Sequence, residues 1–102
     1  MSTPRSRAAE IFGQRVRTAR VARGMSQEDI ANLADMHVTN YGRVERGESN
    51  SELHTIVRIA TALDTDPAEL LAGLYGDGML PPQSRVYSVA DFLAARRAEE
   101  GR

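Results

Sequence analysis

The sequence predicts an all-α fold, and three observations support that prediction. Apolar residues recur every three or four positions along most of the chain, which is the spacing of one buried helix face. A serine or aspartate is followed within three residues by an acidic residue at Ser26, Asp66 and Ser88, a pattern typical of helix N-termini. Alternation of apolar and polar residues, which would indicate half-buried strands, is almost absent.

Three helices are expected in the first half of the chain. The first covers 8–23 and ends at Gly24, because glycine is favoured just past the last turn of a helix. The second begins at Ser26, whose hydroxyl caps a first turn that contains two acidic residues. A very short turn separates this helix from a third one at about 38–46.

Two further helices complete the predicted domain. The segment 52–63 carries a wide apolar stripe, which predicts a helix at the centre of the core. The fifth helix begins after Asp66, with proline at its first position, and its leucines continue to residue 74. A linker that contains glycine and proline follows over 76–82, and a last helix is expected over 88–99.

The chain therefore divides into three segments. Residues 1–7 are polar and are expected to be a flexible N-terminus. Residues 8–75 form the five-helix domain, and residues 76–102 form the linker and a C-terminal helical extension. The apolar side chains of this extension leave two interpretations open: they pack on their own domain, or they form a dimer interface.

The composition argues against catalysis, metal binding and membrane insertion. The 102 residues include no cysteine and only two histidines, so a disulfide, a thiolate metal site or another cofactor is not expected. No spacing of Ser, His and Asp resembles a nucleophile elbow, and there is no glycine-rich phosphate loop. No apolar run approaches the roughly 20 residues that cross a bilayer. We therefore expect a cytoplasmic protein that is not an enzyme and has no membrane partner.

The charge is distributed unevenly along the chain. All thirteen basic residues are arginines, and residues 1–47 hold eight of them against five acidic residues. Residues 48–102 hold five arginines against nine acidic residues. Arginine suits bidentate contacts to phosphate and guanine, although the codon bias of a GC-rich genome would also explain why lysine is absent. The basic first half is therefore the half expected to face a polyanion.

The segment Gln27–Arg46 has the pattern of a helix-turn-helix unit. A unit of twenty residues needs apolar side chains at five places that lock its two helices together, and here they are Ile30, Ala34, Met36, Tyr41 and Val44. Its fifth place must be small because the second helix crosses close over it, and that place is Ala31. Its ninth place lies in the turn and needs positive φ, which Asp35 tolerates better than most residues.

Residues 12–71 resemble the helix-turn-helix domain of the Cro/CI repressor (XRE-like) family. The motifs that carry the resemblance are Phe12-Gly13 with Val16-Arg17, Arg23-Gly24-Met25-Ser26-Gln27, Val44-Glu45-Arg46-Gly47, and Ile59-Ala60-Thr61-Ala62-Leu63 before Leu70-Leu71. The stretch 36–50 also resembles the controller proteins of restriction–modification systems. The resemblance implies a five-helix, lambda-repressor-like DNA-binding domain.

The resemblance also implies how the unit would meet double-stranded DNA. The helix at about 38–46 would enter the major groove, with Val38, Thr39, Asn40 and Arg43 on its outward side. Arg43 can bind guanine through two hydrogen bonds, Asn40 can bind adenine or phosphate, and Val38 and Thr39 can contact a thymine methyl group. The residues expected at phosphates are Gln27, His37 as the N-cap, Arg46 and Asn50.

Glu45 is expected to have a structural role and not to contact DNA. A carboxylate beside DNA would repel it unless a cation neutralises that charge, and the resemblance implies an internal partner. Arg20 on the first helix is the predicted partner, in an ion pair that is at least partly buried.

The function that the sequence favours is sequence-specific regulation of transcription. The protein is expected to bind a palindromic DNA operator as a homodimer, since this fold normally binds two half-sites related by two-fold symmetry. The alternative is a protein-interaction module of the same fold, such as an antitoxin or a co-regulator. The outward side of residues 37–46 favours DNA, because it carries arginines and small polar residues where a protein-binding face would be apolar.

Overall fold

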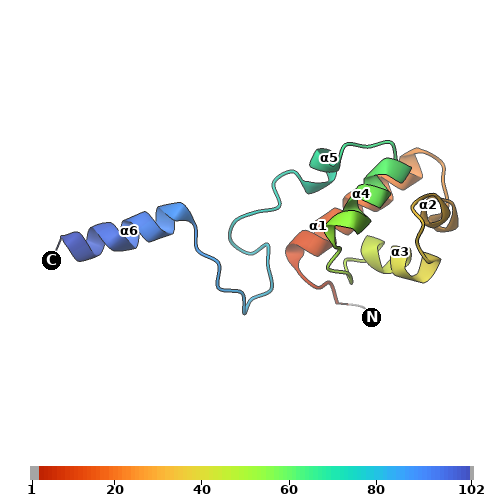
Figure 1. Cartoon of the computed structure of the whole chain (residues 1–102). Helices are drawn as coiled ribbons and strands as arrows, with labels where there is room; N and C mark the ends of the chain where they lie inside the picture. The colour runs from red at the N-terminus through yellow and green to blue at the C-terminus, as the bar shows by residue number, and fades with distance from the viewer. Residues whose placement is uncertain (1–2, 102) are drawn as a thin grey trace.

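The structure is a computed structural model, and it describes residues 3–101 (Figure 1). Six helices and no strand occur in that range. The helices are α1 (Arg7–Ala22), α2 (Gln27–Leu33), α3 (Val38–Glu45), α4 (Leu53–Ala62), α5 (Pro67–Leu71) and α6 (Val89–Glu100). Helices α1 to α5 pack together, while α6 lies apart from them at the other end of the molecule (Figure 1). The all-α prediction is confirmed.

Local sequence signals set the ends of α2 and α3. The Ser26 hydroxyl accepts a hydrogen bond from the Asp29 N–H, and the Asp29 carboxylate accepts one from the Ser26 N–H, so both first-turn groups are satisfied. Asp35 adopts a φ of 56° in the turn, as its place in the unit predicts. His37 is the N-cap of α3, which confirms its predicted structural role.

The core forms where the helix-turn-helix unit meets α1, α4 and α5. Four of the five apolar places in the unit are buried, and the fifth, Met36, packs against them partly buried. Ala31 is 1% exposed, which agrees with the prediction that only a small side chain fits there. The buried apolar residues of the core are Phe12, Val16, Ile30, Ala31, Ala34, Tyr41, Val44, Ile59, Ala60, Leu63 and Leu70.

The wide apolar stripe predicted on α4 is buried along one side only. Ile59, Ala60 and Leu63 are core residues, but Leu53 is 70% exposed and Val57 is 45% exposed. The prediction of a central helix is therefore wrong for this part of the stripe. Helix α4 contacts α2 and α5, and Leu53 and Val57 lie on its exposed side.

Gly13 allows α1 and α3 to approach each other closely. A Cβ atom at this position would lie 2.3 Å from the Val44 carbonyl oxygen and 2.6 Å from the Glu45 carbonyl oxygen. Both distances are far below van der Waals contact, so the two helix backbones can meet in this way only at a glycine.

The N-terminal segment is attached to the domain, where we expected a free end. The Arg5 N–H donates to the Gly47 carbonyl oxygen at 2.7 Å, and Ser6 caps α1 by accepting from the Ala9 N–H. Helix α1 therefore begins at Arg7, inside the segment predicted to be flexible. These residues are held because Gly47, at the start of the loop after α3, offers a carbonyl at the right place. The expected flexibility of residues 1 and 2 lies outside the described residues.

The C-terminal extension is helical as predicted, but its helix is not packed on the domain. Ser88 and Asp91 cap α6 reciprocally, and none of its residues is buried. The linker touches the domain where the Ala8 N–H donates to the Met79 carbonyl oxygen at 3.0 Å. None of the helices within residues 3–101 has the length and apolar character needed to cross a membrane.

Candidate nucleic-acid interface

Helix α3 has one buried side and one exposed side. Tyr41, Val44 and Glu45 face the domain and fix the position of the helix. The residues predicted to meet bases are exposed, and they are Val38, Thr39, Asn40 and Arg43. The core fixes the buried side of this short helix, and the side chains on its exposed side are small or polar. Such a helix can enter a groove without a change of shape.

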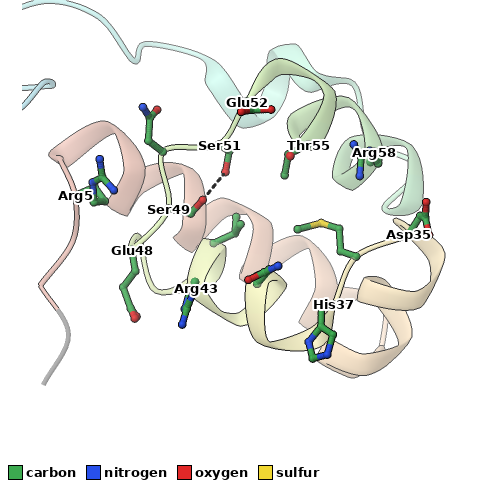
Figure 2. Close-up of a pocket in the computed structure, with 14 residues that line it drawn as sticks. Arg5, Asp35, His37, Arg43, Glu48, Ser49, Ser51, Glu52, Thr55 and Arg58 are labelled. Carbon is green, nitrogen blue, oxygen red and sulfur yellow. Dashed lines mark hydrogen bonds between the residues drawn. The ribbon is translucent and has the colours of Figure 1, made fainter.

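His37 caps the N-terminus of α3. The His37 Nδ1 atom accepts a hydrogen bond of 3.4 Å from the Thr39 N–H. His37 is exposed, and it points away from the core on the same side as Arg43 (Figure 2). Its imidazole thus stands at the outer surface beside the first turn of the helix.

An open polar hollow of about 620 Å³ lies between α3, the loop after it and α4 (Figure 2). Four of the predicted site residues line it: His37, Asn40, Arg43 and Asn50. The opposite wall is formed by α4. The structure therefore brings half of the predicted set together in one concave surface, with Val38 and Thr39 exposed on the adjoining side of α3.

Arg46 and Gln27 do not line the hollow and have internal partners. The Arg46 Nε atom donates to Glu48 Oε2 at 2.8 Å, in an exposed ion pair. The Gln27 Nε2 atom donates to Glu45 Oε1 at 3.0 Å, between α2 and α3. One end of the Gln27 amide is thus occupied within the protein, and its carbonyl oxygen and second N–H remain as groups that could contact a ligand.

Glu45 is the centre of a buried polar cluster. The Arg20 Nε atom donates to Glu45 Oε2 at 2.6 Å, and Arg20 Nη2 donates to Oε1 at 3.0 Å. The Tyr41 hydroxyl donates to Oε2 at 2.6 Å, and Gln27 supplies a fourth hydrogen bond. Glu45 is 6% exposed, so the predicted ion pair between α1 and α3 is confirmed and is buried on the carboxylate side.

The ionisation of this cluster follows from its hydrogen bonds. Burial acts to raise the pKa of Glu45, but the hydrogen bonds from Arg20, Tyr41 and Gln27 outweigh it, and the pKa lies below its ordinary value. Burial and the neighbouring carboxylate together raise the pKa of the Tyr41 hydroxyl. The cluster therefore holds one carboxylate and one guanidinium, both charged, with the phenol neutral.

The site residues predicted from the sequence leave out several residues of the hollow, among them Arg5, Thr55 and Arg58. Thr55 and Arg58 come from α4, and Arg5 comes from the segment before α1. Arg58 lies on the polar side of its helix, opposite the apolar stripe, so its exposure could have been derived from helical periodicity. Arg5 carries no local signal, because its position depends on a hydrogen bond to Gly47, far away in the sequence. Residues 3–101 contain no group of three or more His, Asp or Glu placed to hold a metal ion.

Comparison with known proteins identifies related sequences over the same part of the chain. A family model described as a helix-turn-helix domain matches residues 11–72. The control protein C.SmaI of Serratia marcescens is 40% identical over 62 residues, which cover 61% of this chain and 74% of that protein. The control protein C.BamHI of Bacillus amyloliquefaciens is 42% identical over 62 residues, which cover 60% of this chain and 76% of that protein.

A solved structure agrees with these sequence matches. The restriction–modification controller protein C.AhdI of Aeromonas hydrophila is 47% identical and superposes with a TM-score of 0.60, covering 61% of this chain and 94% of that one. The prophage-derived HTH-type transcriptional regulator YonR of Bacillus subtilis is 28% identical over 95 residues, which cover 88% of both chains. The chain therefore belongs to the helix-turn-helix family that includes the restriction–modification controller proteins and HTH-type transcriptional regulators.

Proposed function

We propose that the protein is a sequence-specific regulator of transcription whose α3 enters the major groove of double-stranded DNA. The observation that carries the proposal is the exposed side of α3, which presents Val38, Thr39, Asn40 and Arg43 while the opposite side is locked in the core. An α-helix fits the major groove of B-DNA, where each base pair offers a distinct pattern of donors and acceptors. Such a regulator would act in the cytoplasm, where the DNA is.

Each exposed residue of α3 matches a chemical feature of a base edge. Arg43 would bind guanine O6 and N7 through two N–H groups. Asn40 can bind adenine through two hydrogen bonds or bind a phosphate, and Val38 and the Thr39 methyl group can contact the thymine methyl group. Within residues 3–101 no carboxylate forms an ion pair with Arg43, which supports its availability for DNA.

Residues around α3 would hold the phosphate backbone. Gln27 stands at the start of α2, where free backbone N–H groups and the helix dipole favour an anion. His37 and Asn50 flank the exposed side of α3 at its two ends. Arg46 remains positively charged in its pair with Glu48, and a phosphate would compete with that carboxylate for its N–H groups.

We further propose that the protein binds a palindromic operator as a homodimer, through its C-terminal part. Helix α5 gives this proposal limited support, because Leu70 is buried in the domain. Helix α6 supports the proposal more strongly, since Phe92 is 61% exposed and Leu93 is 46% exposed. Two recognition helices would then stand about 34 Å apart, one turn of DNA.

Replacing Arg43 with alanine is expected to cost about 1–3 kcal/mol of binding free energy on the preferred sequence and to relax the preference at one base pair in each half-site. The measurement is selection of bound duplexes from random DNA for both proteins, followed by affinity on the selected duplex and on each single-base variant. The matched control is Arg85→Ala, which removes an exposed arginine between the linker and α6 and should leave the preference unchanged. A loss that is equal on all sequences would show that Arg43 contacts phosphate.

Truncation after Gly76 is expected to weaken self-association and operator binding while α1 to α5 remain folded. The removed part contains α6 and its exposed apolar side chains, and it makes few contacts with the domain. Sedimentation equilibrium of the intact and truncated chains measures association, and far-ultraviolet circular dichroism measures folding. Phe92→Ser in the intact chain is the milder variant and should act in the same direction. An intact chain that is monomeric at micromolar concentration would contradict the proposed dimer.

A further inference from the structure

Residues 3–6 form a short segment, here called the N-terminal strap, that is held against the end of α3. The Arg5 N–H donates to the Gly47 carbonyl oxygen at 2.7 Å. Gly47 is buried under this segment, and a Cβ atom there would lie 2.9 Å from the Glu10 Cα atom and 3.2 Å from the Pro4 Cβ atom. The strap therefore has a defined position beside the loop that follows α3.

The position of the strap places the Arg5 side chain at the polar hollow. Arg5 lines that hollow together with Asn40, Arg43 and Asn50, although it comes from a distant part of the sequence. Figure 2 shows it beside the loop that carries Glu48 and Ser49, at the opposite end of the hollow from Asp35 and Arg58. Arg5 thus extends the concave surface beyond the C-terminal end of α3.

The charges around this end of the hollow call for a further cation if a phosphate is to bind there. Glu48 and Glu52 both line the hollow, and their carboxylates would repel a phosphate. Arg46 is paired with Glu48, and Arg7 is paired with Glu10. Arg5 forms no ion pair with another residue in the part of the chain that the structure describes, and its side chain is exposed.

We propose that Arg5 is a phosphate-binding residue, and that the strap positions it to hold the DNA backbone where it passes the loop after α3. The contact would lie next to that of Asn50 and would carry no sequence information, because phosphates are the same at every base pair. The attachment to Gly47 lowers the entropy that the side chain loses on binding, since the backbone of Arg5 is already ordered in the free protein. This inference rests on the proposed function.

The test compares wild-type protein with Arg5→Ala on two duplexes of equal length, the selected operator and an unrelated sequence. Arg5→Ala is expected to weaken binding to both duplexes by the same factor, several-fold at low salt. It should also reduce the slope of log K against log salt concentration by about 0.9 for each protomer bound, because one phosphate contact fewer releases one condensed counterion fewer. Arg5→Lys keeps the charge and should retain the wild-type slope.

The matched control is Arg7→Ala, which removes an arginine two residues from Arg5. The Arg7 side chain pairs with Glu10 and does not line the hollow. Arg7→Ala should leave the slope unchanged. An unaltered slope in Arg5→Ala, an equal change in both variants, or a loss confined to the operator would overturn the inference. Wild-type protein that binds neither duplex would instead refute the proposed function, and the inference would fail with it.

Discussion

Replacing Glu45 with alanine is expected to lower the free energy of unfolding by about 3–5 kcal/mol, the usual cost of removing one partner from a buried ion pair. The substitution leaves the Arg20 guanidinium partly buried without its carboxylate, and it also removes the acceptor of the Tyr41 hydroxyl and of the Gln27 amide. Because these groups come from α1, α2 and α3, the loss should loosen the whole helix-turn-helix unit.

Urea unfolding followed by circular dichroism measures this change. The matched control is Glu10→Ala, which removes the carboxylate of an exposed pair with Arg7 on the surface of α1 and should cost at most about 1 kcal/mol. Equal effects of the two substitutions would contradict the interpretation of the Glu45 cluster as a buried structural element.

The acid range gives a second measurement of the same contact. The pKa of Glu45 in the folded protein lies below its ordinary value of 4.5, so the carboxylate form is favoured by folding. Its contribution to stability is present above that ordinary value and is lost as the pH falls through the lower pKa of the folded state. Wild-type protein should therefore lose more stability than Glu45→Ala when the pH is lowered from about 5 into the acid range.

The parts of the fold that depend on neighbouring residues were predictable from the sequence. Ser26 and Ser88 indicate helix N-termini because their hydroxyl groups accept hydrogen bonds from the N–H groups three residues ahead. The alternation of buried and exposed positions in the helix-turn-helix unit could be derived because two short helices joined by a fixed turn have few ways to pack. The same reasoning placed Val38, Thr39, Asn40 and Arg43 on the exposed side of α3.

The parts that depend on distant contacts were not predictable in this way. Leu53 and Val57 continue the apolar stripe of α4, and the sequence does not show that no element covers them. Gln27 was expected at a phosphate, and the folded chain also brings its amide to the carboxylate of Glu45, eighteen residues away. The place of Arg5 depends on a carbonyl group forty-two residues away, since residue 5 bonds residue 47.

Helices α1 and α3 can cross closely because Gly13 has no side chain. Gly13→Ala is expected to destabilise the fold by about 3 kcal/mol, the upper end of the range for overpacked sites. The new Cβ atom would meet two backbone carbonyl oxygens, at 2.3 and 2.6 Å, and helix backbones cannot move aside as a flexible side chain can. The two helices would have to separate, which also lengthens the contact between Arg20 and Glu45.

Gly42→Ala is the matched control for this prediction, because Gly42 is also a buried helical glycine but faces no backbone atom of another helix. A Cβ atom there would meet only the ends of two flexible side chains, Arg46 Nη1 at 3.0 Å and Gln27 Oε1 at 3.7 Å. Alanine also favours the helix over glycine by about 1 kcal/mol. Gly42→Ala should therefore leave the free energy of unfolding unchanged or raise it slightly. Thermal and urea unfolding measure the stability of both variants. Equal losses of stability would contradict the prediction, because the close approach at Gly13 would then not be the constraint that sets the angle between α1 and α3.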